Sequence, residues 1–265
     1  MSAERKGGKV IIAGAGPGDV ELITLKLQKR LAEADVIITD RLVNPDIISS
    51  HAKKDALILL AGKKGFDENS FSQEEVTALI VEHALQGKTV LRLKGGDVAF
   101  FSNVLDELQS LVDKNIPYEI IPGITAASGA SAYSGIPLTA RGYSQGVQFL
   151  TFNPNSHYNP EKWKSLALTN DTLVFYMATK NINDLVELLS SYTNKFDTPL
   201  AVIEQATTKY QQIHITTLKK SANDLAGVLF SSPSLIIVGE VVNLHERFNW
   251  FVSENPGSVF LELEK

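Results

Sequence analysis

The sequence predicts an α/β protein of two domains, the first built on a mainly parallel sheet. Two observations predict this. Short apolar runs alternate along the first half with segments of helical periodicity, which is the pattern of parallel strands joined by helices. The composition then shifts, so we place a domain boundary between Leu138 and Gly146. We expect domains at 9–140 and 141–252, with tails at 1–8 and 253–265.

The first domain is expected to contain five strands with helices between them. Each expected strand is a short apolar run that stops at a glycine, a proline or a polar turn. The strands are expected at 9–13, 35–38, 57–61, 89–93 and 118–121. Helices are expected at 24–34, from Pro45 onward, at 74–85, at 104–112 and over the small residues 124–132. Ser72 and Glu75 have the spacing of a capping box, which predicts where the third helix begins.

The second half predicts a different α/β unit, because no repeat of the first half is visible in it. Strands are expected at 147–151, 172–176, 200–204, 212–216 and 235–238, and helices near 182–190 and 221–230. In the first of these helices, four apolar residues at helical spacing form one face: Ile182, Leu185, Val186 and Leu189. A cleft between two such units is the natural place for a ligand.

The composition excludes several classes of site. The chain has 265 residues, 44% of them hydrophobic, and no cysteine, which excludes disulfides and thiolate chemistry and fits a cytoplasmic location. The five histidines do not have metal-ligand spacing, so we expect no metal. A net charge of −5 gives no basic surface for nucleic acid, and no apolar run is long enough to span a membrane. An anionic substrate would therefore need local cations.

Glycine-rich or charged loops follow the expected parallel strands, where ligands gather in open α/β sheets. The loop at 14–19 reads Gly-Ala-Gly-Pro-Gly-Asp. It is not a dinucleotide fingerprint, because the glycine spacing differs and Pro17 removes a backbone N–H that a pyrophosphate would use. The stretch 88–102 reads as a strand that ends at Gly95-Gly96-Asp97. These three residues are either an ordinary turn or one wall of a small-molecule site.

Two further features allow alternative interpretations. Asp40 ends the second expected strand beside Arg41, and the two residues are either a functional pair or a surface ion pair. The small residues at 126–132 allow close approach of backbone, which either a packed neighbour or a ligand could use.

The motifs taken together resemble those of the uroporphyrinogen-III C-methyltransferases, which belong to the tetrapyrrole methylases that use S-adenosylmethionine. The resemblance covers about 10–251. The segments that carry it are 14–19, Asp-Arg-Leu-Val at 40–43, Gly-Lys at 62–63, Gln-Glu-Glu at 73–75, Arg-Leu-Lys-Gly-Gly-Asp at 92–97, Pro-Gly-Ile-Thr at 122–125, Gly-Ile-Pro-Leu-Thr at 135–139, Leu-Val-Phe-Tyr-Met at 173–177 and Val-Gly-Glu-Val-Val at 238–242.

This resemblance implies a fold, a reaction and a set of site residues. The fold would be a two-domain tetrapyrrole-methylase fold, with a smaller mixed-sheet C-terminal domain, in a homodimer. The reaction would methylate uroporphyrinogen III at C-2 and C-7 to give precorrin-2, on the route to sirohaem and cobalamin. The methyl donor would be bound by Pro17, Gly95, Gly96, Asp97, Phe100, Thr125, Ala126, Met177 and Ala206. Asp40 would be the general base and Lys63 a proton donor, and Arg41, Lys64 and Arg141 would bind the substrate carboxylates.

The sequence also departs from the family pattern. The segment 98–104 lacks the proline, arginine and two glycines that usually follow Gly-Gly-Asp, and Ala206 replaces a usual glycine. Three functions therefore stay open: the methyltransferase above, a related methylase with a different tetrapyrrole substrate, and a donor-binding regulator without catalysis. The role of Asp40 is open too, because its field alone could stabilise a pyrrolinium intermediate.

Overall fold

The computed structural model describes residues 7–61, 72–254 and 257–260, which form two compact units. The first unit contains 7–125 together with 258–260, and the second is Ala126–Gly257. Each unit has one five-stranded sheet of its own. None of the helices in the described ranges is long and apolar enough to cross a membrane.

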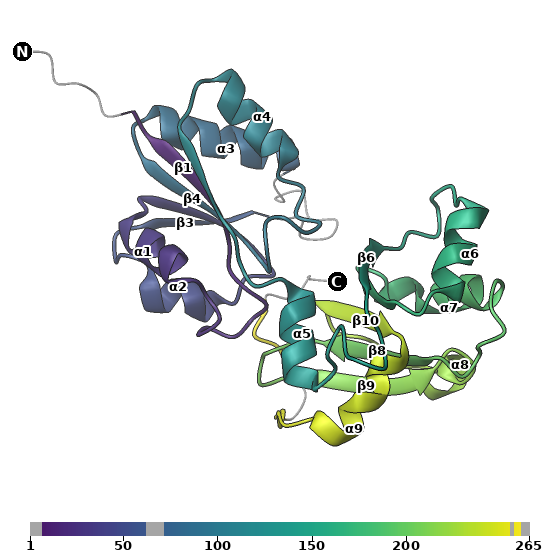
Figure 1. Ribbon diagram of the computed structural model, residues 1–265. Coiled ribbons are helices and arrows are strands. Elements are labelled where there is room, and N and C mark those ends of the chain that lie inside the picture. The colour runs from purple at the N-terminus through teal and green to yellow at the C-terminus, as the bar shows by residue number, and fades with distance from the viewer. Residues whose placement is uncertain (1–6, 62–71, 255–256, 261–265) are drawn as a thin grey trace, which may run out of the picture. The chain divides into compact units, whose positions relative to one another are not determined.

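The first unit is a parallel sheet with helices on both faces, as Figure 1 shows. Its strands are β1 (Lys9–Gly14), β2 (Val36–Asp40), β3 (Leu57–Ala61), β4 (Thr89–Lys94) and β5 (Tyr118–Ile121), in the order β3-β2-β4-β1-β5. All four pairings are parallel. Its helices are α1 (Leu25–Glu33), α2 (Pro45–His51), α3 (Gln73–Leu85) and α4 (Leu105–Asp113). Both the parallel sheet and the strand positions predicted from the sequence are confirmed.

Alternation along β1 explains why both faces are covered. Ile11 and Ala13 pack in a cluster with residues of α1 and α2, whereas Val10 and Ile12 pack in a second cluster with residues of α3 and α4. Successive side chains of a strand point to opposite faces, so an all-apolar strand must be buried on both. The capping box is confirmed: Ser72 Oγ accepts from Glu75 N at 3.2 Å, and Glu75 Oε2 accepts from Ser72 N at 2.5 Å.

The second unit is a mixed sheet. Its strands are β6 (Val147–Thr151), β7 (Thr172–Tyr176), β8 (Pro199–Glu204), β9 (Gln212–Thr217) and β10 (Ser234–Val238), in the order β6-β7-β10-β8-β9. Among the strands in the described part of this unit, only β6 and β7 pair in parallel, and the three other pairings are antiparallel. Its helices are α5 (Ala126–Ser134), α6 (Pro160–Leu168), α7 (Ile182–Ser190), α8 (Ser221–Asp224) and α9 (His245–Phe248).

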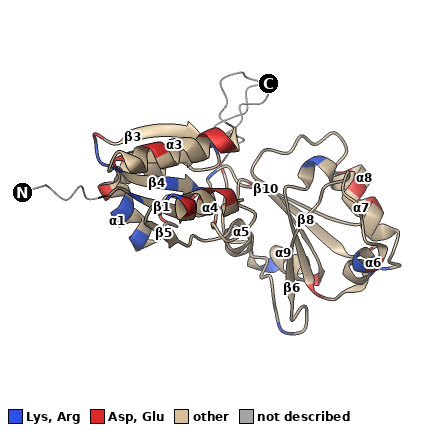
Figure 2. Ribbon diagram, turned by 90° about the horizontal axis from the view of Figure 1, so that it is seen from above, with Lys and Arg blue, Asp and Glu red and all other residues tan. Residues whose placement is uncertain are grey.

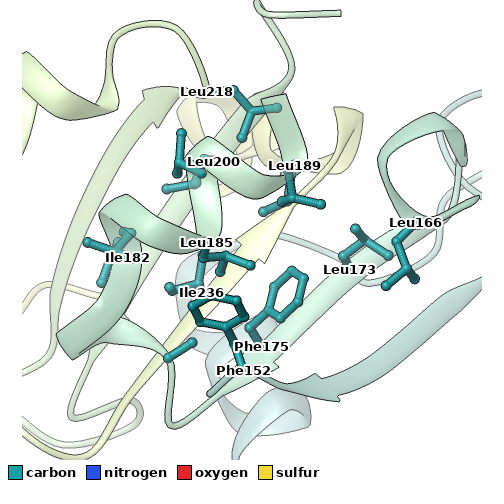
Figure 3. Close-up of a cluster of buried hydrophobic side chains, with 14 of the residues drawn as sticks. Phe152, Leu166, Leu173, Phe175, Ile182, Leu185, Leu189, Leu200, Leu218 and Ile236 are labelled. Carbon is teal, nitrogen blue, oxygen red and sulfur yellow. The ribbon is translucent and has the colours of Figure 1, made fainter. Parts of the chain in front are cut away.

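The core of this second unit lies on both faces of its sheet. One cluster joins α6 and α7 to the sheet through fully buried residues such as Phe175, Leu185 and Ile236, which Figure 3 shows packed together. The four-residue face predicted for 182–190 lies in this cluster. A second cluster contains Ala127 and Ala130 of α5. This places α5 in the second unit, so the division by contacts falls after Thr125, earlier than the boundary placed between Leu138 and Gly146.

Two helices differ from the sequence prediction. The expected helix at 221–230 ends at Asp224, because Gly227 lies in a turn with φ +74°. Helix α6 was missed, although Asn159 and Pro160 are typical of a helix start: Asn159 Oδ1 accepts from Glu161 N at 3.0 Å.

Glu119 of β5 links the sheet to α1 and gives a prediction about stability. Its carboxylate lies 2.5 Å from Lys26 Nζ and 2.9 Å from Arg30 Nε. Hydrogen bonds from Arg30 and Lys26 lower the pKa of Glu119 from 4.5 to about 2. A carboxylate with a lowered pKa stabilises the fold above its unfolded pKa, and this contribution is lost as the pH falls from 4.5 towards 2.

We expect Glu119→Gln to lower the free energy of unfolding by about 1 kcal/mol at pH 7, because the group is partly exposed and its ion pairs are screened. Urea unfolding followed by circular dichroism at pH 7 and pH 3 checks this. The difference from the unmodified chain should shrink at pH 3. Glu33→Gln, which removes an exposed partner of Arg30, is the matched control and should change stability less. An equal effect of the two variants would contradict the prediction.

Candidate active site

Loops from three strands of the first unit meet at the carboxyl edge of its sheet. Gly16 and Gly96 pair through their backbones: Gly16 N donates to Gly96 O at 3.0 Å, and Gly96 N donates to Gly16 O at 2.7 Å. A Cβ on Gly14 would lie 2.5 Å from Gly96 O and 2.9 Å from Gly123 N. The loops after β1, β4 and β5 are therefore in direct backbone contact. We call Gly14, Gly16, Gly96 and Gly123 the glycine cluster.

The four glycines of the glycine cluster have a packing role, and the family resemblance predicts a further role in donor binding for one of them, Gly96. Gly16 and Gly96 have φ values of +79° and +68°, which favour glycine. Gly95 packs against Leu42, where a Cβ would lie 2.8 Å from the carbonyl oxygen. Close backbone packing alone therefore accounts for glycine at these positions of the carboxyl edge, without a ligand.

Gly123→Ala is expected to destabilise the first unit by about 1–3 kcal/mol, because the new Cβ would overlap Gly96 O and lie 2.8 Å from Gly14 C. Urea unfolding followed by circular dichroism measures the loss. Gly7→Ala is the control, since a Cβ there meets nothing within 4 Å. Wild-type stability in the Gly123 variant would show that the three loops can separate at little cost.

Asp40 lies at the end of β2, at the same carboxyl edge. Its Oδ1 is 2.6 Å from Nη2 of Arg92, whose side chain is 3% exposed. The sequence suggested Arg41 as the partner of Asp40, but the ion pair in the structure is with Arg92 of the neighbouring strand β4. Arg41 is half-buried, and this burial lowers its pKa in spite of the nearby charge of Asp40. Asp40 itself remains 32% exposed, so a ligand can reach it.

The residues after β4 form a turn that begins at Asp97. The carboxylate of Asp97 accepts from Ala99 N at 2.8 Å, and its carbonyl accepts from Phe100 N at 3.3 Å. Pro17 is buried in the first loop. The structure thus brings Pro17, Gly95, Gly96, Asp97 and Thr125 to the edge that carries Asp40, with Phe100 one turn further on.

Residues predicted to bind the donor also meet at one edge of the second sheet. Strands β7 and β8 both run antiparallel to β10, so their carboxyl ends lie at the same edge. Met177 follows β7, with φ +56° and an exposed fraction of 65%, and Ala206 follows β8. The backbone N–H of Ala127, next to Ala126, donates to Tyr176 Oη at 3.2 Å. Ala126, Met177 and Ala206 therefore belong to one group.

Arg141 lies apart from this group within the second unit. It is exposed in a turn closed by Ala140 and Ser144, whose Oγ accepts from Thr172 N at the start of β7. Met177 follows the other end of that strand. Lys63 and Lys64 lie outside the described residues. No cluster of metal-ligating side chains occurs within the described part of the chain.

The sequence did not predict the buried group of charged side chains to which Asp40 is joined through Arg92. Arg92 and Lys94 of β4 and Glu107 of α4 are each at most 3% exposed. Arg92 Nε and Lys94 Nζ lie 3.0 and 3.2 Å from Glu107 Oε1. A signal was present, because a charged residue inside an apolar strand must find a buried partner. The identity of that partner could not be read from the sequence.

Comparison with known proteins adds a family. Residues 9–222 match the family described as Tetrapyrrole (Corrin/Porphyrin) Methylases. A siroheme synthase of Actinobacillus succinogenes is 41% identical over 251 residues, which cover 95% of this chain and 52% of that protein. One of Acinetobacter baylyi is 41% identical over 243 residues, with 92% and 53% covered. The chain spans about half the length of the curated relatives it matches.

Solved structures agree with this match. A uroporphyrin-III C-methyl transferase from Thermus thermophilus, complexed with S-adenyl homocysteine, has 32% identity and a TM-score of 0.75 over 89% of this chain and 100% of that one. A cobalt precorrin-4 methyltransferase has 25% identity and a TM-score of 0.80 over 91% and 99%. Because the family match extends over most of both units, the chain belongs to the tetrapyrrole methylase family.

Proposed function

We propose that the protein is an S-adenosylmethionine-dependent C-methyltransferase that converts uroporphyrinogen III to precorrin-2. The observation that carries the proposal is the position of Asp40: a partly exposed carboxylate, held by a buried arginine, at the edge where the family's loop motifs converge. The methyltransferase of known structure that is 32% identical supports the substrate and the donor. The product would serve sirohaem or cobalamin synthesis.

The residues of the chain fit the proposed donor. The small side chains of Ala126 and Ala206 suit close approach of an adenosine, and exposed Met177 offers a soft apolar surface. The other residues that we propose for donor binding belong to the first unit: Pro17, Gly95, Gly96, Asp97, Phe100 and Thr125. The carboxylate of Asp97 would favour a cationic ligand. When bound, the donor supplies a methyl group activated by a sulfonium.

The chain's own residues would then manage protons and charge. A pyrrole carbon that gains a methyl group leaves the substrate with a proton to lose, and Asp40 would accept it as general base. Lys63 would act as a proton donor. The acidic side chains of the substrate would pair with Arg41, Lys64 and Arg141. These cations are needed locally because the net charge of the chain is −5.

The proposal also includes the location and the oligomeric state of the protein. We place the enzyme in the cytoplasm as a homodimer without nucleic-acid or membrane partners. The absence of cysteine supports a reducing compartment, and the family resemblance supports the dimer. Size-exclusion chromatography with light scattering tests the dimer directly.

One observation favours a different tetrapyrrole as the substrate. In the segment 98–104, Phe101 and Asn103 have φ values of +53° and +50°, which are uncommon for residues other than glycine. A loop with this shape could select a different tetrapyrrole precursor. A related methylase is therefore the second candidate function.

One assay separates the candidates. The protein is incubated with labelled S-adenosylmethionine and fresh uroporphyrinogen III, and the product is weighed by mass spectrometry. A product two methyl groups heavier supports the proposal. Donor binding without transfer to uroporphyrinogen III, followed by transfer to a partly methylated precursor, supports the second candidate. Donor binding without transfer to either supports a regulator.

A further inference from the structure

Four charged side chains form a connected group in the first unit: Asp40, Arg92, Lys94 and Glu107. Two are cations and two are carboxylates, so the formal charges balance. Figure 2 shows the basic residues of β4 in blue and the acidic start of α4 in red. Buried charges are costly unless they are paired, so the geometry of this group is strongly constrained.

Glu107 is the fixed end of the group. It is 1% exposed, and its Oε1 accepts from Gln73 Nε2 at 3.1 Å, from Arg92 Nε at 3.0 Å and from Lys94 Nζ at 3.2 Å. Its Oε2 is buried and has no hydrogen-bond partner within the described ranges. Three donors on one oxygen hold the carboxylate in a single orientation.

Arg92 connects Glu107 to Asp40 with its planar fork. Nε donates to Glu107, Nη2 donates to Asp40 Oδ1 at 2.6 Å, and Nη1 lies 3.3 Å from the carbonyl oxygens of Ile38 and Leu93. Burial lowers the pKa of Arg92, but the charges and hydrogen bonds of Asp40 and Glu107 outweigh this and raise it above its ordinary value. The arginine therefore stays charged, and every arm of its fork is engaged.

We infer that Glu107 is a positioning residue that orients the Asp40 carboxylate through Arg92. This rests on the proposed function, in which Asp40 accepts a proton from the substrate. Glu107 holds Nε and so decides where Nη2 points. Without its negative charge, Arg92 and Lys94 would share the single carboxylate of Asp40. A buried helix residue would in this way control the geometry of the reacting carboxylate.

A double-mutant cycle between Glu107→Gln and Asp40→Asn tests the inference. In the otherwise unmodified enzyme, Glu107→Gln is expected to lower kcat about 100-fold, as a small displacement of a catalytic group can do, with donor affinity by calorimetry unchanged. In the Asp40→Asn background it should have no further effect. An equal loss in both backgrounds would mean that Glu107 acts only on general structure, and would overturn the inference.

The unfolding free energies of the same four proteins give a readout that needs no substrate. Because Glu107 and Asp40 share Arg92, the effects of the two substitutions on urea unfolding should be non-additive. Additive effects would overturn the inference that Arg92 couples Glu107 to Asp40, whatever the substrate is. If the unmodified chain does not methylate uroporphyrinogen III, the proposed function fails. The unfolding cycle still decides whether Glu107 and Asp40 are coupled through Arg92. Asp113→Asn, an exposed carboxylate at the end of α4, is the matched control and should leave kcat unchanged.

A second variant covers the case in which Glu107→Gln does not fold. Arg92→Lys keeps the charge but loses the fork, so it can reach only one of the two carboxylates. We expect it to lower kcat to a similar degree and to show the same non-additivity with Asp40→Asn. Full activity of Arg92→Lys would overturn the inference that Arg92 couples Glu107 to Asp40.

Discussion

Asp40→Asn should lower methyl transfer by about 10²–10⁴-fold while donor affinity stays the same, because Asp40 is the proposed general base and such a group contributes rate enhancement of this size. The substitution keeps the shape and an acceptor oxygen for Arg92 Nη2, so the local structure should be retained. It removes the charge and most of the basicity. Single-turnover kinetics with labelled donor measure the rate, and calorimetry measures donor binding.

The matched control for this prediction is the same substitution at the other end of the strand. Asp35 precedes β2, roughly 16 Å from Asp40 at the usual rise of a strand, and pairs with Lys53 at 2.6 Å. Asp35→Asn should cost some stability and leave the rate unchanged. If Asp40→Asn kept full turnover, Asp40 would have no part in the chemistry, and another group would have to accept the proton.

Phe175→Ala should destabilise the second unit by about 3–5 kcal/mol, the usual cost of removing a buried phenylalanine. Phe175 is fully buried and stacks on Trp163, with ring centroids 6.3 Å apart. Both tryptophans of the chain, Trp163 and Trp250, belong to this unit, so tryptophan fluorescence during urea unfolding reports on it selectively.

Phe196→Ala is the control for the packing argument. Phe196 belongs to the same unit but is 45% exposed, so its removal should change stability by less than about 1 kcal/mol. If the two variants lost equal stability, packing around Phe175 would not explain the effect.

All ten strands of the described residues were predictable, because most are short apolar runs with a clear stop and periodicity depends only on local sequence. The helix at 182–190 was predictable from its apolar face for the same reason. Helix α6 was harder, since its buried residues Trp163 and Leu166 give only a partial stripe. Local signals therefore determined most of the elements but not all of their ends.

The candidate site was less predictable, because its important contacts join residues far apart in the sequence. Asp40 was identified from its strand end, but its partner Arg92 is 52 residues away and Glu107 lies on a different element. The partner assigned from the sequence was the adjacent Arg41. Adjacent residues of opposite charge suggest a pair, whereas pairing across a sheet depends on strand order, which a single sequence does not provide.

The glycine cluster has a consequence for how this protein could be altered. Its contacts between the three loops are made by main-chain atoms, so these contacts do not depend on which side chains the neighbouring residues carry. Directed evolution of the proposed activity can therefore change the residues between the glycines while the backbone contacts of the glycine cluster are kept. The same property makes the four glycine codons intolerant, since every missense change there adds a Cβ where backbone packing or a left-handed φ opposes it.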